Sequence, residues 1–419
     1  MESKSMAARI LFCATYPTQP IGYGRVANKL SNFLSAKVGA EVHYFGFSNF
    51  QAAAVQRKVQ PGIRFIDVLA EEGLPHDNFG TTIIAKYVRL VEPDYIFIYN
   101  DIIVVCRLLN ALQEAKAAGH RYRLVVYIDL VFPYENLTYL DYLRREADVV
   151  LVFSEVWKKH LLELNFEADR LHVLPHWVST KLVHPTNAAQ ARARLGIGSQ
   201  DFVVLNTNRN SYRKMWDITI RAFLQFLRRV REESPFTLET RPVKLFCNCA
   251  AQSQSGYDLL NLIDTECRKL NLNYADVTSN HIFQLPRSGF VSDEEVNLLY
   301  NSADVGINTC CGEGFGLCNT EGASLDVPQV VSAVGAFVDI FGQFPLALVQ
   351  PVLSIRAPKL LDDHTGDLYI CSSSDFADRL FLFYKNEGLR LSEGRSQGLF
   401  IRNKYTFDEA KKVIRKVFA

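Results

Sequence analysis

Short, nearly unbroken apolar runs recur along the chain, and each is followed by a turn and a stretch in which apolar residues have helical spacing. The first half contains RILFCAT (9–15), EVHYFGF (41–47), DYIFIYN (94–100), RLVVYID (123–129) and DVVLVFS (148–154). The second half contains DFVVLNT (201–207), VKLFCNC (243–249), HIFQLP (281–286), DVGINT (304–309) and PQVVSAV (328–334). Such runs are typical of parallel strands covered on both faces. We therefore predict an α/β protein with two doubly wound domains, whose ligands bind beyond the carboxyl ends of the strands.

The organisation of the chain follows from a break between the two sets of runs. A length of 419 residues suits two or three domains. The segment LPHWVSTKLVHPTNAAQARARLGIGSQ carries two prolines and a polar stretch, which indicates a linker near residues 175–200. The tail from Thr406 has the spacing of one amphipathic helix. We expect one domain over 1–184, a second over 185–402 and a terminal helix over 403–419.

Composition excludes several classes of partner. A net charge of +1 offers no basic footprint for nucleic acid. No apolar run approaches the roughly 20 residues that cross a bilayer, so no transmembrane segment is expected, and peripheral membrane contact stays open. Nine cysteines and a start without a signal-peptide layout predict a reducing, cytoplasmic setting. The pairs Cys247/Cys249 and Cys310/Cys311 lack C-x-x-C spacing, so we expect buried thiols and no metal site.

A glycine-containing turn follows the first predicted strand. Gly22 and Gly24 in PTQPIGYGRVANKL precede a helix with Val26, Leu30 and Phe33 on one face. Glycines let a backbone approach a ligand closely, and the helix start that follows attracts anions. The same glycines also suit a tight strand-to-helix turn. The third glycine of the dinucleotide fingerprint is missing, which disfavours a dehydrogenase.

Two cations lie just beyond the first strand of the second half, in NTNRNSYRKMWD. Arg209 and Lys214 sit five residues apart at the carboxyl end of this strand. In that place they can clamp a diphosphate and neutralise its charge as it leaves. The alternative is a solvated basic helix start, and we assign Arg213 to such a surface.

The segment CCGEGFGLCNTEGA places two carboxylates around three glycines. The strand DVGINT leads to Glu313 in the loop, and seven residues separate it from Glu321 in the helix that we expect from Gly316. Carboxylates accept paired hydrogen bonds from neighbouring hydroxyls, so these two suit a sugar and a ribose. The amides at the helix start would face an anion. The alternative, two unrelated surface glutamates, fits poorly beside the glycines and Phe315.

These glutamates, within EGFGLCNTEGASLDVPQVVSAVGA, resemble the paired-glutamate signature of the retaining glycosyltransferases of family four. The segments GYGRVANKL, LPHWVSTKLVHP, NRNSYRK and GFVSDEEVNLLYNSADVGINT are similar to further family motifs, so the resemblance extends over nearly the whole chain. The set GYGRV, IYND, NRN, RK and EGFGLC is similar to glycosyltransferases carried by large DNA viruses of algae and protists. The resemblance implies the GT-B fold, in which two Rossmann-like domains enclose a cleft and a terminal helix, here YTFDEAKKVI, crosses back to the first domain.

The resemblance also implies roles for individual residues. Arg209 and Lys214 would bind the donor diphosphate, Glu321 the nucleotide ribose, and Glu313 the hydroxyls of the transferred sugar. The implied donor-binding set is Gly22, Gly24, Gly289, Gly314, Phe315, Gly316 and Glu321.

The activity implied is transfer of a hexose from a nucleoside diphosphate sugar, with GDP-mannose favoured, to a hydroxyl acceptor, most simply a glycan. The donor is a substrate, and neither a cofactor nor a metal is expected. If the chain is viral, the setting is the host cytoplasm. A GT-B epimerase or phosphorylase, and a sugar-nucleotide-binding module without turnover, are the alternatives. Screening sugar nucleotides by thermal shift would identify the donor.

One position departs from the family pattern. Many members carry a histidine after the strand that here ends VVYIDL, whereas this chain has Asp129. Asp129 could orient the acceptor or accept its proton, and it could equally cap a turn. Asn100 and Asp101, after the strand IFIY, are acceptor-side candidates with the same alternative. His176 lies in the linker and suits a structural role.

Overall fold

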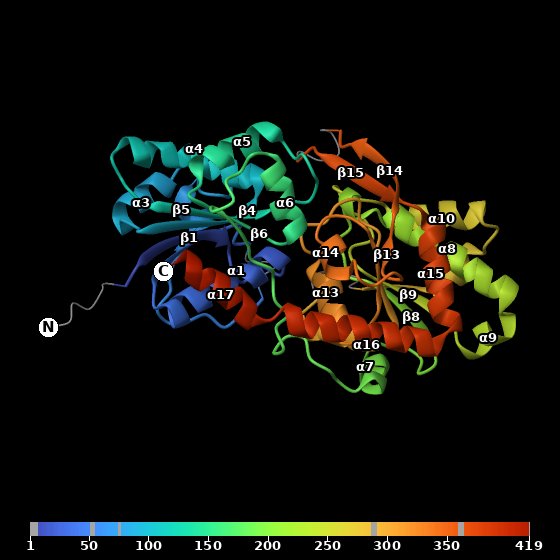
Figure 1. Ribbon diagram of the computed structural model, residues 1–419. Coiled ribbons are helices and arrows are strands. Elements are labelled where there is room, and N and C mark those ends of the chain that lie inside the picture. Colours follow the sequence, from blue (N-terminus) through green and yellow to red (C-terminus); the bar gives the residue numbers. More distant parts are fainter. Residues whose placement is uncertain (1–6, 51–54, 74–76, 286–290, 359–363, 419) are drawn as a thin grey trace. The chain divides into compact units, whose positions relative to one another are not determined.

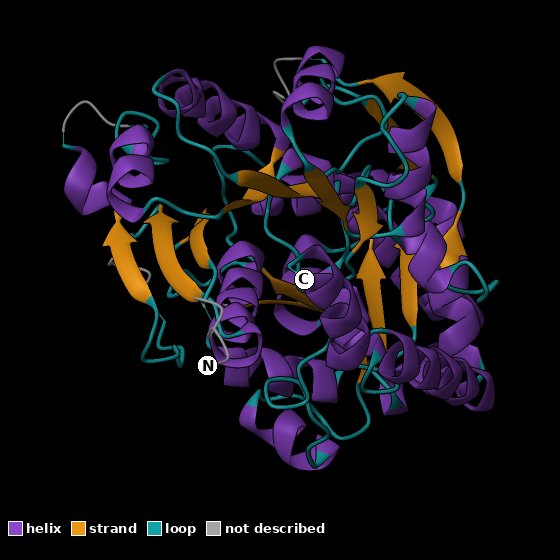
Figure 2. Cartoon of the chain, turned by 60° about the vertical axis from the view of Figure 1, so that its left-hand side comes forward, coloured by secondary structure: helices purple, strands orange, loops and turns teal. Residues whose placement is uncertain are grey.

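Figure 1 shows a computed structural model of the chain, which describes residues 7–50, 55–73, 77–285, 291–358 and 364–418. The chain divides into two compact units. Unit 1 comprises Met1–Leu130, Tyr134–His176 and Ala410–Ala419, and unit 2 comprises Val131–Pro133 and Trp177–Glu409. Each unit is built around a parallel sheet with helices on both faces (Figure 1 and Figure 2).

Unit 1 contains a seven-stranded sheet in the order β3-β2-β1-β4-β5-β6-β7, in which all neighbours are parallel. Its strands are β1 (Arg9–Thr15), β2 (Glu41–Phe47), β3 (Arg64–Asp67), β4 (Tyr95–Asp101), β5 (Arg123–Asp129), β6 (Val149–Val152) and β7 (Leu171–Val173). Its helical segments are α1 (Gly22–Phe33), the π-helical η1 (Leu34–Val38), α2 (Val68–Glu72), α3 (Ile84–Val91), α4 (Ile102–Ala117), α5 (Leu137–Glu146) and α6 (Glu155–Glu163).

The terminal helix α17 (Phe407–Val417) brings the end of the chain back to unit 1, which includes residues from Ala410 onward. Beyond its end, the Phe418 ring packs against Tyr95 and Phe97 of β4, with centroid distances of 5.0 and 6.1 Å. In Figure 1, α1 and α17 lie on one side of this sheet and α3, α4 and α5 on the other. The amphipathic tail predicted from the sequence therefore covers part of the unit 1 sheet.

Unit 2 contains a six-stranded sheet in the order β10-β9-β8-β11-β12-β13, again with parallel neighbours. Its strands are β8 (Phe202–Asn206), β9 (Val243–Asn248), β10 (Ile282–Leu285), β11 (Val305–Asn308), β12 (Gln329–Ser332) and β13 (Leu348–Val349). Its helical segments are α7 (Ala188–Arg194), the 3-10 turn η3 (Tyr212–Lys214), α8 (Trp216–Glu233), α9 (Pro235–Thr240), α10 (Leu259–Lys269), α11 (Tyr274–Asn280), α12 (Asp293–Ser302), α13 (Leu317–Ala323), α14 (Phe337–Phe341), α15 (Ser373–Lys385) and α16 (Glu387–Lys404).

Burial on both faces explains why the strands lack polar alternation. In β8, Phe202 and Val204 pack with the apolar face of α8, whereas Val203 and Leu205 pack into a separate cluster on the other face. All four are at most 5% exposed. Full burial of such a side chain contributes about 1.5–3 kcal/mol, so a polar residue at any of these positions would be costly.

All ten predicted strands are present, and the prediction of two doubly wound α/β domains is confirmed. The prediction omitted the short strands β3, β7 and β13 and an antiparallel hairpin of β14 (Pro351–Arg356) and β15 (Asp367–Cys371). Residues 352–356 of β14 are all exposed, so its sequence lacks the apolar run of a covered strand. Within the described ranges, no helix has the length and apolarity needed to span a bilayer.

Candidate functional site

Two loops of unit 2 meet at the carboxyl end of its sheet, because β8 and β11 are parallel neighbours. The loop after β8 leads to η3, and the loop after β11 leads to α13. The loops are tied together by hydrogen bonds from the Cys311 amide to the Arg213 carbonyl (3.0 Å) and from the Arg213 guanidinium to the Gly312 carbonyl (2.6 Å). Residues about a hundred positions apart in sequence therefore lie side by side.

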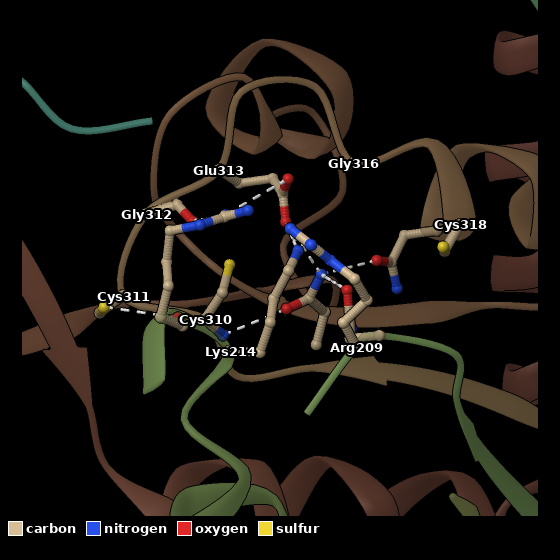
Figure 3. A network of polar contacts seen from close by, with 12 residues as sticks. Arg209, Lys214, Cys310, Cys311, Gly312, Glu313, Gly316 and Cys318 are labelled. Carbon is tan, nitrogen blue, oxygen red and sulfur yellow. Dashed lines mark hydrogen bonds and ion pairs between the residues drawn. The ribbon is translucent and has the colours of Figure 1, made fainter. Parts of the chain in front are cut away.

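A buried ion pair joins these loops. Lys214 Nζ donates to Glu313 Oε2, and the two residues are only 7% and 6% exposed (Figure 3). Glu313 Oε1 lies 3.6 Å from an Arg213 guanidinium nitrogen. Our assignment of Arg213 to a solvated surface is therefore wrong, because its backbone pairing with the neighbouring loop turns the side chain, which is half-buried, to the carboxylate.

Arg209 lies on the same side of the sheet and is exposed. Its carbonyl accepts a hydrogen bond from the Trp216 indole nitrogen (3.0 Å), which fixes the turn before α8. Figure 3 shows the side chains of Arg209 and Lys214 both extending toward the region of Glu313. The predicted cations and the first glutamate thus form one cluster.

The charge state of Glu313 follows from its surroundings. Burial alone would raise its pKa, but the nearby charges of Lys214 and Arg213 outweigh this effect, with hydrogen bonds from Lys214 and Asn308 adding to theirs, and lower the pKa to about 2. The carboxylate is therefore ionised at neutral pH. The cluster carries a surplus of positive charge, which suits an anionic ligand.

This shift predicts how the stability of the protein depends on pH. A carboxyl whose pKa is lowered on folding stabilises the folded state fully above its unfolded value, near 4.5, and loses that contribution as pH falls toward 2. In Glu313→Gln this contribution is absent, so we expect a smaller loss of stability between pH 4.5 and 2 than in the unmodified protein. Urea unfolding at a series of acidic pH values measures the difference. If the free energy of unfolding fell equally with pH in the two proteins, the lowered pKa of Glu313 would be wrong.

The second glutamate is more deeply buried than the first. Glu321 lies in α13, is 1% exposed, and accepts a hydrogen bond from the Tyr300 hydroxyl of α12 at 3.1 Å. Tyr300 was not identified from the sequence, since it lies on another helix and in an ordinary amphipathic pattern. It fixes one oxygen of the carboxylate that we expected to bind a ribose.

The glycine loop before α13 has little space for side chains. Gly316 caps the helix with φ +83°, and a Cβ there would lie 2.1 Å from the Phe337 ring. A Cβ on Gly312 would lie 2.4 Å from the Val131 carbonyl oxygen. Phe315 is buried and contacts the Tyr405 ring at 5.6 Å. Packing thus restricts the backbone on both sides of Gly314. Gly289, also predicted to bind the donor, lies outside the described residues.

The remaining candidates belong to unit 1. Gly22 begins α1, and a Cβ on Gly24 would lie 2.6 Å from the Gln19 carbonyl, so Gly24 serves at least the tight turn. The register of β4 and β5 places Asp101 beside Asp129 at the carboxyl end of the sheet. The Tyr23 hydroxyl donates to Asp129 at 2.6 Å, a partner that the sequence did not suggest.

The other polar residues of this edge have local structural contacts. Asp101 caps α4 by accepting from the Val104 amide (3.0 Å), and buried Asn100 accepts from the Asp101 amide (2.8 Å). His176 is buried and contacts the Tyr127 hydroxyl at 2.7 Å. Burial holds its pKa well below the usual value, so the ring is neutral.

Metal ligands and cysteines give no further candidate in the described part of the chain. There, no group of three or more His, Cys, Asp or Glu side chains is arranged to hold a metal ion. The nine cysteines are free thiols, and all but Cys318 are buried.

The comparisons with known proteins place this architecture. The chain matches no known protein-family profile. Over 197 residues it is 30% identical to a D-inositol 3-phosphate glycosyltransferase of Acidothermus cellulolyticus, a match that spans 45% of this chain and 40% of that protein.

Solved structures match over almost the full length. A sucrose-phosphate synthase from Thermosynechococcus elongatus has a TM-score of 0.72 at 16% identity, and Alr3699/HepE of Anabaena, in complex with UDP and glucose, has 0.69 at 16%. Both matches cover 98% of this chain and 99% of the other. The chain therefore has the GT-B fold of two Rossmann-like domains.

Proposed function

We propose that this chain is a retaining glycosyltransferase of GT-B type, which moves a hexose from a nucleoside diphosphate sugar to a hydroxyl acceptor. The observation that carries the proposal is the buried Lys214–Glu313 pair, with Arg213 and Arg209 beside it, at the carboxyl ends of β8 and β11. In open α/β sheets, ligands bind at this edge. Cations there match a diphosphate, and a carboxylate matches sugar hydroxyls.

The comparisons support the same activity. The sequence relative is named a glycosyltransferase, and Alr3699/HepE has been solved with UDP-glucose as well as with UDP and glucose. The chain spans less than half of that relative, so its acceptor is not transferred to this protein. A nucleoside diphosphate sugar is the ligand class that these names and the charges of the site have in common.

The proposed reaction breaks the bond between the anomeric carbon and the β-phosphate oxygen and forms a bond to the acceptor oxygen on the same face. Lys214 and Arg209 stabilise the negative charge that develops on the departing diphosphate. The acceptor proton passes to an oxygen of that phosphate. Because the phosphate takes this proton, no side chain needs to act as the base. Glu313 holds the sugar hydroxyls, and Asp129 is the candidate that orients the acceptor.

We propose GDP-mannose as the donor and a glycan as the acceptor, both from the sequence resemblance. UDP-glucose, the ligand of the Anabaena structure, is the donor to test against it. The experiment offers a panel of sugar nucleotides with oligosaccharide acceptors, and NMR reports the anomeric configuration of any product. Transfer with retention supports the proposal. Donor binding without turnover supports the inactive binding module, and inversion contradicts the mechanism.

Replacing the second glutamate tests the ribose assignment. We expect Glu321→Ala to weaken donor binding by about 1–3 kcal/mol, because a hydrogen-bonded carboxylate is lost from a buried site. Calorimetric titration of the donor measures the effect. Tyr300→Phe, which removes only the hydroxyl that contacts Glu321, is the matched variant and should cost less. Unchanged affinity in Glu321→Ala would reject the assignment.

Removing metal ions with a chelator tests whether the protein's own cations are sufficient to balance the charge of the diphosphate. We expect turnover to survive EDTA, because Lys214, Arg209 and Arg213 supply the positive charge that balances a diphosphate. Initial rates with and without EDTA, followed by addition of Mn²⁺, measure the dependence. Loss of activity that Mn²⁺ restores would contradict a reaction run by protein charges alone.

A further inference from the structure

A row of buried amide side chains extends from Glu313 into the core of unit 2. Asn308 Nδ2 lies 3.4 Å from Glu313 Oε2 and donates to Asn319 Oδ1 at 2.8 Å. Asn319 Nδ2 donates to Gln329 Oε1 at 2.9 Å, and the Gln329 backbone amide donates to Gln397 Oε1 at 2.9 Å. All four amide residues are at most 4% exposed.

Two backbone groups fix the direction of the first three amides of this row. Asn308 Oδ1 accepts from the Cys310 amide (3.1 Å), and a backbone N–H can only donate. The NH₂ group of Asn308 must therefore face Glu313 and Asn319. At the third amide, Gln329 Nε2 donates to the Val327 carbonyl (2.9 Å), which can only accept. Asn319, between Asn308 and Gln329, therefore also has one allowed orientation.

The surrounding backbone makes room for the row. A Cβ on Gly306 would lie 2.0 Å from Gln329 Oε1, and one on Gly322 would lie 2.9 Å from Gln329 Nε2. Burying an amide side chain destabilises the fold unless its hydrogen bonds are made, whereas apolar side chains would fill the same space without that condition. The row therefore meets the candidate site at one end, where Asn308 lies beside the Glu313 carboxylate.

The proposed function gives Lys214 two partners, the Glu313 carboxylate and the diphosphate of the sugar donor. It pairs with Glu313 Oε2 in the absence of a ligand, yet the donor diphosphate needs the same ammonium group. The second N–H of Asn308 is shared between Glu313 Oε2 at 3.4 Å and Asn208 Oδ1 at 3.5 Å, both longer than an ordinary hydrogen bond. While Lys214 donates to Glu313 Oε2, the Asn308 N–H beside it makes only long contacts and could form a shorter hydrogen bond to the same oxygen.

We propose that Asn308, held in one orientation by Asn319 and Gln329, is a positioning residue that takes over Glu313 Oε2 when Lys214 turns to the diphosphate. Glu313 then stays fixed and ionised, with its other oxygen directed to the sugar hydroxyls. The inference rests on the proposed function, because it assigns a change of partner to the donor-bound state. It adds a group that does not contact the substrate and acts only through Glu313.

The test compares the affinity for a nucleoside diphosphate with that for the corresponding nucleotide sugar. Asn308→Leu removes the side-chain N–H that donates to Glu313. Asn308→Asp loses the same N–H but keeps the shape of the side chain and an oxygen that accepts from the Cys310 amide. We expect both variants to bind the nucleotide sugar no more tightly than the nucleoside diphosphate. Their kcat should be about 10- to 100-fold lower, as for a lost hydrogen bond to a charged group. Affinity for the diphosphate alone should change less than about twofold.

Gln397→Leu is the matched control, because it removes an amide from the remote end of the row, away from Glu313. We expect it to lower the melting temperature and leave kcat unchanged. In Asn308→Asp, activity should recover as pH falls, since the introduced carboxyl gains an O–H that can donate to Glu313. If the unmodified protein binds no nucleotide sugar, the proposed function fails and the inference fails with it. If the unmodified protein binds and turns over a nucleotide sugar, but the Asn308 variants keep its kcat and still bind the nucleotide sugar as much more tightly than the diphosphate, the inference alone is overturned.

Discussion

Lys214→Ala should lower kcat by roughly 100- to 1,000-fold, the loss seen when a preorganised group that stabilises developing charge is removed. Lys214 is 7% exposed, so little water replaces its ammonium group, and it is held at the carboxyl end of the sheet, where the diphosphate would leave. The free energy of unfolding should fall only modestly, because Arg213 still lies 3.6 Å from Glu313 and continues to balance the charge of that carboxylate. Steady-state kinetics with saturating donor measures the effect.

Lys244→Ala is the matched control. Lys244 lies near the start of β9 in the same sheet, at the edge opposite the site, and donates to the Asn280 carbonyl. Its removal should leave kcat unchanged. If Lys214→Ala also retained the original kcat, Lys214 would be a structural residue and the diphosphate clamp would be wrong.

Glu313→Gln should lower kcat by about 100-fold and cost about 3–5 kcal/mol of stability. The substitution preserves shape but leaves buried Lys214 and half-buried Arg213 without their anion, and removing one partner of a buried pair is more costly than never burying the pair. The sugar also loses a charged acceptor for its hydroxyls. Kinetics and urea unfolding on the same preparations separate the two losses.

Glu266→Gln provides the control for the stability effect. Glu266 is also a buried carboxylate between two cations, Arg221 at 3.1 Å and Lys269 at 2.8 Å, but it lies on α10, away from the loops of the site. We expect a loss of stability with unchanged kcat. A Glu313→Gln protein that is destabilised but turns over normally would show that the Lys214–Glu313 pair serves folding alone.

The strands and the places of Lys214 and Glu313 just after two of them were predictable because their signals are local. A run such as FVVLN is apolar throughout since both faces of β8 are covered, and a cation just after it lies beyond the carboxyl end of the strand. Arg213 was misassigned because its orientation depends on a backbone contact with Cys311, about a hundred residues later. Asn308 was overlooked because it ends an apolar strand. Its partner Asn319 comes from a helix, and Asn319 in turn contacts Gln329 of a second strand. Such contacts become visible only when the sheet is assembled.

A crystal structure with a nucleoside diphosphate sugar tests the central claim most directly. We expect the diphosphate to contact Lys214 and Arg209, the ribose to contact Glu321, and the sugar hydroxyls to contact Glu313. Lys214 Nζ should have moved from Glu313 to phosphate, with Asn308 Nδ2 closer than 3.4 Å to the carboxylate. A nucleotide bound elsewhere, or one bound here with the Lys214–Glu313 pair intact and no contact to either glutamate, would contradict the assignment of this site.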